Sequence, residues 1–195
     1  MIKKLIPELE AISDTELRFG AVEILTKFED TLEWCPSSST GEYHESDPLL
    51  LDHLKRTFRF AYSLCEHEHL PRLNFNITIT AALIHDIGKC ASVQLKYPGE
   101  EAVTREPTNW AFRQDTFWVY RPHWNNHPVT GSLEIMKCET LPHKEEIATL
   151  VYTHHNKWFP NPQEVLNLEG RIVSMADYLS SRDYVRFAKG WRKYG

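Results

Sequence analysis

The chain has 195 residues, a formal net charge of −5 at pH 7 and a hydrophobic share of 42%. This length suits one domain with a sizeable core, and the acidic balance argues against a surface that attracts nucleic acid over its whole extent. The start of the chain does not have the pattern of a signal peptide and no stretch is apolar for long enough to span a membrane, so we expect a cytoplasmic protein.

Residues 1–33 are expected to form an N-terminal packing helix. Its regular part spans residues 14–33, where apolar side chains recur at helical spacing behind a capping Ser13 or Asp14. The stretch 35–47 gathers proline, serine, threonine and glycine, which predicts a loop.

A second helix should begin near Pro48, because proline favours the first turn of a helix. Its apolar face carries His53 among leucines and a phenylalanine. A histidine on such a face is usually a hydrogen-bonded core residue. The position of His53 ahead of a His-Asp pair in the same chain favours a metal ligand instead.

The central element is a buried helix over residues 76–89, which ends in Ala-Ala-Leu-Ile-His85-Asp86-Ile-Gly88-Lys89. Gly88 can adopt the left-handed conformation that closes a helix, so His85 and Asp86 are expected in the last turn. Two polar groups buried there need partners. A divalent cation would satisfy both at once, whereas an isolated His-Asp pair is more often a hydrogen-bonded core histidine beside a helix-end aspartate.

Residues 91–126 interrupt the helical pattern and are expected to form an irregular, aromatic-rich insertion. Within it, Phe117–Tyr120 could form a short strand or hairpin, although no stretch alternates strictly enough to predict a sheet. The aromatic residues are interleaved with arginines. They fit either a small additional core or a wall over the site that stacks a base and pairs with phosphate. The second interpretation makes Trp124 a candidate substrate contact.

The last third of the chain returns to a helical pattern. One helix should begin at Pro128 with His127 at its cap, and another should run from Pro142 to His154 and His155. Adjacent side chains point roughly 100° apart on a regular helix. Both histidines can therefore coordinate only if the helix end distorts or if metals lie on either side of it.

A loop is expected over residues 156–163, followed by a final helix over residues 164–187. The inward face of this helix includes Met175 and lies close to Asp177. Residues 186–195 form a basic tail, which is expected to be a solvated or frayed end.

Seven candidate ligands thus follow one another in the order His53, His85, Asp86, His127, His154, His155 and Asp177. This order resembles the HD superfamily of metal-dependent phosphohydrolases in its HDIG form, over most of the chain. It is similar to the HD-GYP type of cyclic-dinucleotide phosphodiesterase. Here, however, Asn156–Pro160 stands where those enzymes carry Gly-Tyr-Pro, so cyclic di-GMP is expected to be a poor substrate.

The resemblance implies an all-α helical bundle, a single domain over residues 1–195, with the metal site in its interior. A first metal site would be formed by His53, His85, Asp86 and Asp177, and a second by His127, His154 and His155, with Asp86 as the bridge. The expected cofactors are therefore divalent metal ions, two in number. Imidazole and carboxylate donors suit Mn, Fe, Co, Ni or Zn, with Mg possible.

The implied activity is hydrolysis of a phosphoester bond in a small, nucleotide-like substrate by a metal-activated water. Asp86 would be catalytic as the bridging ligand, and Lys89 would reach the substrate phosphate. Lys89 could instead be an ordinary lysine that complements a helix dipole. Arg182, about one turn beyond Asp177, is a weaker candidate for phosphate contact.

Two other functions stay open. The same order of candidate ligands also resembles that of the HD nucleases of CRISPR systems. The aromatic insertion and the basic tail would then bind single-stranded nucleic acid. The acidic net charge counts against nucleic acid as the partner. The third interpretation is a non-catalytic, metal-containing module that binds a ligand, against which the full set of seven candidate ligands argues. The identity of the metal and of the substrate and the oligomeric state are left open.

Overall fold

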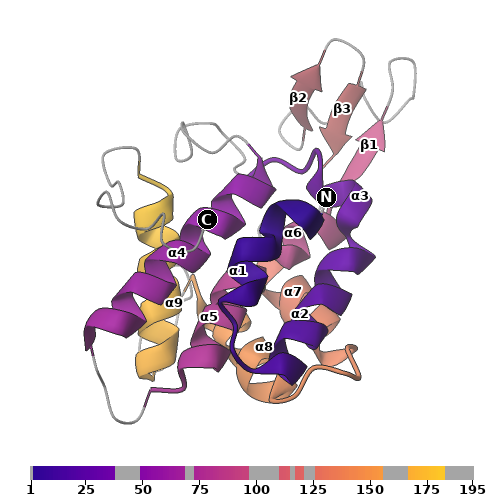
Figure 1. The fold of residues 1–195 in the computed structure, drawn as a ribbon. Helices are drawn as coiled ribbons and strands as arrows, with labels where there is room; N and C mark the ends of the chain where they lie inside the picture. The colour runs from indigo at the N-terminus through magenta and orange to yellow at the C-terminus, as the bar shows by residue number, and fades with distance from the viewer. Residues whose placement is uncertain are drawn as a thin grey trace.

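The computed structural model describes residues 2–37, 49–68, 73–96, 110–114, 117–120, 126–155 and 167–182. Helices dominate these segments: a 3-10 helix at Ile2–Leu5 and α-helices α1 (Ile6–Glu10), α2 (Thr15–Lys27), α3 (Glu29–Leu32), α4 (Leu50–Glu68), α5 (Phe75–Ile84), α6 (Ile87–Ala91), α7 (His127–Met136), α8 (Lys144–Thr153) and α9 (Leu168–Ser180). They pack as a bundle (Figure 1), which confirms the predicted all-α class. None of the helices in the described segments is long and apolar enough to cross a membrane.

Helix α5 forms the centre of the bundle. It packs against α2, α4, α8 and α9, and every residue from Ile77 to Ile84 is buried. Each of these positions holds an apolar residue or a threonine, so this stretch has no charged face to turn toward water. Asn74 caps the helix by accepting a hydrogen bond from the amide of Ile77 at 3.3 Å. The residues that follow α5 therefore lie in the interior of the bundle.

The structure differs from the sequence prediction at the end of this central helix. The helix expected over residues 76–89 is divided in two, because α5 ends at Ile84 and α6 begins at Ile87. Asp86 has φ −101° and ψ 10° and turns the chain between the two helices. Gly88 lies inside α6, so the prediction that it closes a helix was wrong.

Gly88 permits the close contact between α6 and α7. A Cβ atom at this position would lie 2.0 Å from the carbonyl oxygen of His127 and 2.5 Å from the amide nitrogen of Gly131. A Cβ on Gly131 would in turn lie 3.2 Å from the amide nitrogen of Gly88. The two helices thus touch backbone to backbone, which only glycine allows at this distance. The contact brings Asp86, just before α6, close to His127 at the start of α7.

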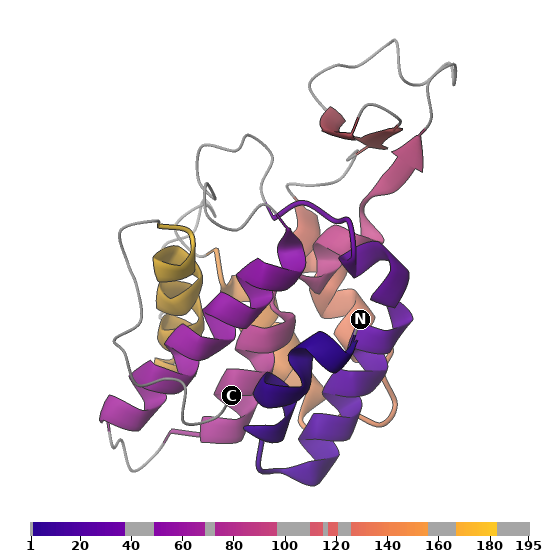
Figure 2. The ribbon, with the colours of Figure 1, turned by 45° about the horizontal axis from the view of Figure 1, so that its top comes forward.

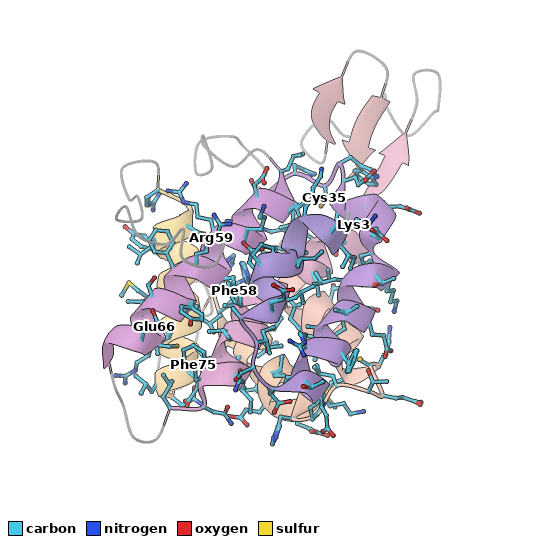
Figure 3. All side chains as sticks on the ribbon, in the orientation of Figure 1. Lys3, Cys35, Phe58, Arg59, Glu66 and Phe75 are labelled. Atoms are coloured by element: carbon cyan, nitrogen blue, oxygen red, sulfur yellow. The ribbon has the colours of Figure 1, made fainter. Side chains whose placement is uncertain are left out.

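The N-terminal helices pack against α4 and α5. Asp14 caps α2 as predicted, by accepting hydrogen bonds from two amides of the first turn at 3.0 and 3.1 Å. The helix predicted over residues 14–33 is interrupted at Phe28, whose φ of −112° and ψ of 16° are not helical. The buried carboxylate of Glu8 pairs at 2.8 Å with Arg59, which is labelled on α4 in Figure 3, and this ion pair ties α1 to α4.

Helices α7 and α8 begin close to their predicted starts. Helix α7 begins at His127, one residue before the predicted Pro128, and its N-cap is Asn126 and not the predicted His127. Helix α8 begins at Lys144, two residues after the predicted Pro142, because His143 adopts the left-handed conformation with φ 54° just before it.

Helix α9 occupies the middle of the helix predicted over residues 164–187 and lies alongside α4 (Figure 1). Asn167 caps it by accepting a hydrogen bond from the amide of Gly170 at 2.9 Å. Met175 is 51% exposed, so its predicted place on the inward face was wrong. The predicted loop over 156–163 and the basic tail over 186–195 lie outside the described residues.

Three short strands follow α6. Strands β1 (Gln94–Lys96), β2 (Trp110–Gln114) and β3 (Phe117–Tyr120) form an antiparallel sheet in the order β1-β3-β2. Figures 1 and 2 both show this sheet projecting from the bundle beyond α3 and α6. The strand suggested for Phe117–Tyr120 is confirmed, and the insertion over residues 91–126 also contains a sheet that the sequence did not predict. Trp124 lies outside the described residues.

Candidate metal centre

Seven polar side chains converge in the interior of the bundle. They come from α4, from the turn between α5 and α6, from the start of α7, from the end of α8 and from α9. Five of them are no more than 4% exposed, and the other two are partly exposed. These are the seven predicted ligands, all of which the structure brings together: His53, His85, Asp86, His127, His154, His155 and Asp177.

The carboxylate of Asp86 lies in the middle of this cluster and has imidazoles on both sides. Its Oδ2 lies 3.3 Å from Nε2 of His53 and 3.3 Å from Nε2 of His85. Its Oδ1 lies 2.9 Å from Nε2 of His127 and 3.5 Å from Nε2 of His154. A carboxylate has lone pairs on both oxygens. Asp86 can therefore contact two neighbouring cation sites at once.

Asp177 approaches the same cluster from α9. Its Oδ1 lies 3.2 Å from Nε2 of His53 and 3.6 Å from Nε2 of His85, and its Oδ2 lies 3.2 Å from Nε2 of His155. Three groups in the described residues have donor atoms within 4.8 Å of one another and could each hold an ion: His53 with His85 and Asp86, His127 with His154 and His155, and His85 with His154 and Asp177.

The adjacent histidines at the end of α8 belong to one group. Helix α8 ends at Thr153, so His154 and His155 follow its last regular turn. Their ring centroids are 4.1 Å apart, and the ring of His155 lies 4.9 Å from that of His127. The divergence expected on a regular helix therefore does not separate them.

The backbone fixes the ring orientation of two buried histidines. Nδ1 of His85 lies 2.9 Å from the carbonyl oxygen of Ala82, and Nδ1 of His154 lies 2.5 Å from the carbonyl oxygen of Val151. Both carbonyls lie near the end of a helix, where the helix itself leaves them without a partner. A carbonyl can only accept, so each Nδ1 carries a proton. When either ring is neutral, its Nε2 directs a lone pair into the cluster.

The metal-free cluster shifts the pKa values of its histidines in opposite directions. Burial lowers the pKa of His154 to about 3, and the neighbouring His155 contributes to the same shift. Burial also acts to lower the pKa of His85. The charges and hydrogen bonds of Asp86 and Asp177 together outweigh burial there and raise the pKa of His85 to about 10.

Both carboxylates of the cluster stay ionised. Burial acts to raise the pKa of Asp86, but the charges of Lys89 and His85 hold it well below its ordinary value. Burial likewise acts to raise the pKa of Asp177, and hydrogen bonds from the surrounding histidines, led by His155, hold it well below the ordinary value. In the metal-free site, the two negative carboxylates therefore face positive charges on His85 and Lys89.

Metal binding is therefore expected to release a proton from His85. With a metal-free pKa of about 10, its ring is protonated at pH 7 and must lose that proton before Nε2 can coordinate. The apparent affinity for Mn²⁺ should rise by about tenfold per pH unit between pH 6 and 8, because one proton competes with the ion. Calorimetric titrations in buffers of different ionisation enthalpy measure this release, and an enthalpy that does not depend on the buffer would contradict it.

The donor set fits divalent metal ions. Among the described residues, Oδ1 of Asp86 and Nε2 of His154 are buried polar atoms with no hydrogen-bond partner. They lie 3.5 Å apart without the geometry of a hydrogen bond. Leaving buried polar atoms unsatisfied costs free energy, and a cation between them would remove that cost. Imidazole and carboxylate donors together suit Mn, Fe, Co, Ni and Zn.

Lys89 is buried against the cluster. Its Nζ donates to Oδ2 of Asp86 and, at 2.7 Å, to the carbonyl oxygen of Ser37. The residue lies inside α6 and not beyond a helix end as predicted. Its positive charge thus faces the same carboxylate oxygen that faces His53 and His85.

Arg182 follows the end of α9. Its guanidinium lies over the ring of Tyr178, with 4.6 Å between the guanidinium carbon and the ring centroid. Its carbonyl oxygen accepts a hydrogen bond from Arg56 at 2.7 Å. These contacts place Arg182 between α4 and α9, and its predicted contact with substrate phosphate stays a prediction.

Two hydroxyls behind the cluster were missed by the sequence analysis. Oγ of Ser180 lies 3.0 Å from Nδ1 of His53, and Oγ1 of Thr57 donates to that serine oxygen at 2.9 Å. Thr57 follows His53 by one turn of α4, and Ser180 follows Asp177 by one turn of α9. Side chains one turn apart lie on the same helix face, and that spacing is the signal that could have revealed them.

The comparisons with known proteins agree with this geometry. The profile of the HD domain matches residues 50–182, a stretch that contains every predicted ligand from His53 to Asp177. No curated protein and no solved structure matches the chain. The match covers more than half of the chain, and HD-domain proteins are usually metal-dependent hydrolases. The chain therefore belongs to the HD-domain family.

Proposed function

We propose that this chain is a metal-dependent phosphoric ester hydrolase that uses two divalent ions to cleave a phosphoester bond in a nucleotide-like substrate. The position of Asp86 carries the proposal. Each of its two oxygens faces a different pair of histidines, at 2.9–3.5 Å. A site for one ion would need only one of these oxygens. A bridging carboxylate between two sets of imidazoles supports two ions, of the kind that act on phosphoesters.

In this proposal each ion has its own set of donors, and Asp86 belongs to both. Oδ2 of Asp86 would join His53, His85 and Asp177 around the first ion, and Oδ1 would join His127, His154 and His155 around the second. Divalent ions bound there supply Lewis acidity toward a phosphoryl oxygen and lower the pKa of a water molecule. The low exposure of the donors limits competition from bulk water, which strengthens the attraction between charges.

Lys89 would contact the substrate phosphate. Its ammonium now shares Oδ2 of Asp86 with the first donor set, so an ion bound there competes with it for that oxygen. The carbonyl of Ser37 would keep the ammonium beside the ions after that exchange. A buried positive charge in this place complements the negative oxygens of a phosphate.

Metal analysis and a substrate screen test the proposal together. The protein, purified without chelator and supplemented with Mn²⁺ or Ni²⁺, is expected to bind two ions per chain. It should then hydrolyse bis(p-nitrophenyl) phosphate or p-nitrophenyl phosphate and at least one nucleotide, with cyclic di-GMP as a poor substrate. Lys89→Ala should keep both ions and lower turnover about tenfold, because it removes a charged phosphate contact and no metal ligand.

Three outcomes would lead away from this proposal. Zero ions bound by folded, supplemented protein would remove the metal centre. Two ions without hydrolysis of any phosphoester would support a ligand-binding module. Cleavage of single-stranded DNA or RNA in strong preference to small phosphoesters would support a nuclease.

A further inference from the structure

Two hydroxyl groups connect the helices that carry His53 and Asp177. Thr57 and Ser180 are both buried, at 0% and 1% exposure. The hydroxyl of Thr57 donates to Oγ of Ser180 at 2.9 Å, and Oγ of Ser180 donates to the carbonyl oxygen of Asp177 at 2.8 Å. The same serine oxygen lies 3.0 Å from Nδ1 of His53. A short chain of hydrogen bonds therefore runs from α4 through Ser180 to α9, directly behind His53.

The Ser180 hydroxyl has a single hydrogen, and the partner that receives it determines whether Nδ1 of His53 donates or accepts. The carbonyl of Asp177 can only accept, so the bond between them uses the serine hydrogen. Oγ of Ser180 is then an acceptor toward Thr57 and toward His53. Nδ1 of His53 must consequently carry a proton. This assignment holds for the charged ring and for the neutral ring that can bind a metal through Nε2.

The partner printed at Nδ1 of His53 is a side-chain hydroxyl, that of Ser180. The rings of His85 and His154 use carbonyls near the ends of their helices. His53 lies in the first turns of α4, where the carbonyls ahead of it already accept helical hydrogen bonds, such as the one from its own amide to Leu49 at 3.2 Å. A hydroxyl from the neighbouring α9 fills this role.

We propose that Ser180 is a positioning residue that holds the proton of His53 on Nδ1 and thereby presents Nε2 to a metal ion, and that Thr57 helps to orient the Ser180 hydroxyl. The inference rests on the metal centre of the proposed function and does not depend on which phosphoester is cleaved. A neighbour that holds the far nitrogen of a ligating histidine commonly changes metal affinity about 10–100-fold when it is removed.

The first test is spectroscopic and uses metal-free protein. Correlation spectra of the ¹⁵N-labelled histidine rings report which nitrogen carries the proton, and the His53 signals are assigned by their loss in His53→Asn. In the wild type, Nδ1 of His53 should carry a proton that exchanges slowly with water. In Ser180→Ala that proton should exchange rapidly or shift to Nε2. A wild-type ring with a bare Nδ1 would overturn the proposal, whatever the protein hydrolyses.

The second test is metal affinity, measured by calorimetric titration with Zn²⁺. Ser180→Ala should weaken binding of one ion about 10–100-fold and leave the other within about threefold, because only one donor set contains His53. Thr57→Val should change the affinity by less than about threefold, since Ser180 can still donate to Asp177 and accept from His53. Equal weakening of both ions, or none with Ser180→Ala, would contradict the assignment.

Matched controls separate positioning from folding. Ser181 lies next to Ser180, and its hydroxyl donates to the carbonyl three residues earlier, that of Tyr178, at 2.8 Å. Ser181→Ala therefore removes the same kind of helical bond without touching His53. Thr149→Val controls for the change from threonine to valine on a helix, because the exposed Thr149 hydroxyl donates to the carbonyl of Glu145 in its own helix at 2.7 Å. If Ser181→Ala lowers zinc affinity as much as Ser180→Ala, the effect is structural and the proposal fails.

Discussion

Asp86→Asn is expected to abolish phosphoester hydrolysis, lowering kcat/KM on the order of 10³-fold, or ~4 kcal/mol of transition-state stabilisation. The side chain keeps its shape, but the negative charge between the two donor sets is lost. One of the two oxygens, each 3.5 Å or less from an imidazole, becomes an amide nitrogen that cannot coordinate. Both sets lose their shared ligand, so metal content should fall as well as activity.

The same substitution should lower the pKa of His85 in metal-free protein. Burial acts to lower the pKa of His85, and the charge of Asp86 is a leading cause of its rise to about 10. With a neutral amide in place of that charge, the effect of burial is opposed less strongly and the pKa falls. NMR titration of the His85 ring in the absence of metal measures this change. The readout does not require activity and shows whether the carboxylate has its assigned contacts.

Asp52→Asn is the matched control. Asp52 is an exposed carboxylate on α4, next to His53 in the chain. Its neutralisation changes the net charge by the same amount and should leave metal content, hydrolysis and the His85 titration unchanged. Full activity of Asp86→Asn with full metal content would point to a contaminating phosphatase and would remove Asp86 from the mechanism.

The sequence predicted the seven side chains that converge in the candidate metal centre. Residue type and order along the chain singled out His53, the His-Asp pair and Asp177, and helical periodicity with capping residues such as Asp14 placed the elements that carry them. Periodicity and capping depend on neighbours within a few residues. The converging positions of the seven side chains then follow from packing of the helices.

The features that the sequence did not predict depend on distant contacts. From the helical pattern, Gly88 was predicted to end a helix. In the structure a glycine is required there because the backbone of His127, far along the chain, leaves no room for a Cβ atom. The strands of the small sheet pair across the insertion, as Trp110 does with Tyr120, and are too short for a clear alternation. Ser180 contacts His53 because α9 packs beside α4, and this packing cannot be read from the residues around Ser180.

Gly88→Ala is expected to disable the second donor set without removing any ligand. The added Cβ would lie 2.0 Å from the carbonyl oxygen of His127 and 2.5 Å from the amide nitrogen of Gly131. Both are backbone atoms and cannot rotate away, so α6 and α7 must separate. His127 then moves away from Oδ1 of Asp86, now 2.9 Å from its Nε2. Displacement of about 1 Å at such a site can cost about 100-fold in rate, and overpacking typically costs 1–3 kcal/mol of stability.

Gly20→Ala distinguishes loss of the site from loss of stability. A Cβ at Gly20 would lie 2.5 Å from Cδ1 and 2.7 Å from Cα of Leu141, so this substitution also forces apart packed segments, away from the metal ligands. Both variants should show lower free energies of unfolding in urea. Only Gly88→Ala should bind one ion fewer and lose hydrolysis about 100-fold, because only its clash is with the backbone of a ligand. If Gly88→Ala keeps wild-type metal content, the contact between α6 and α7 does not set the position of His127.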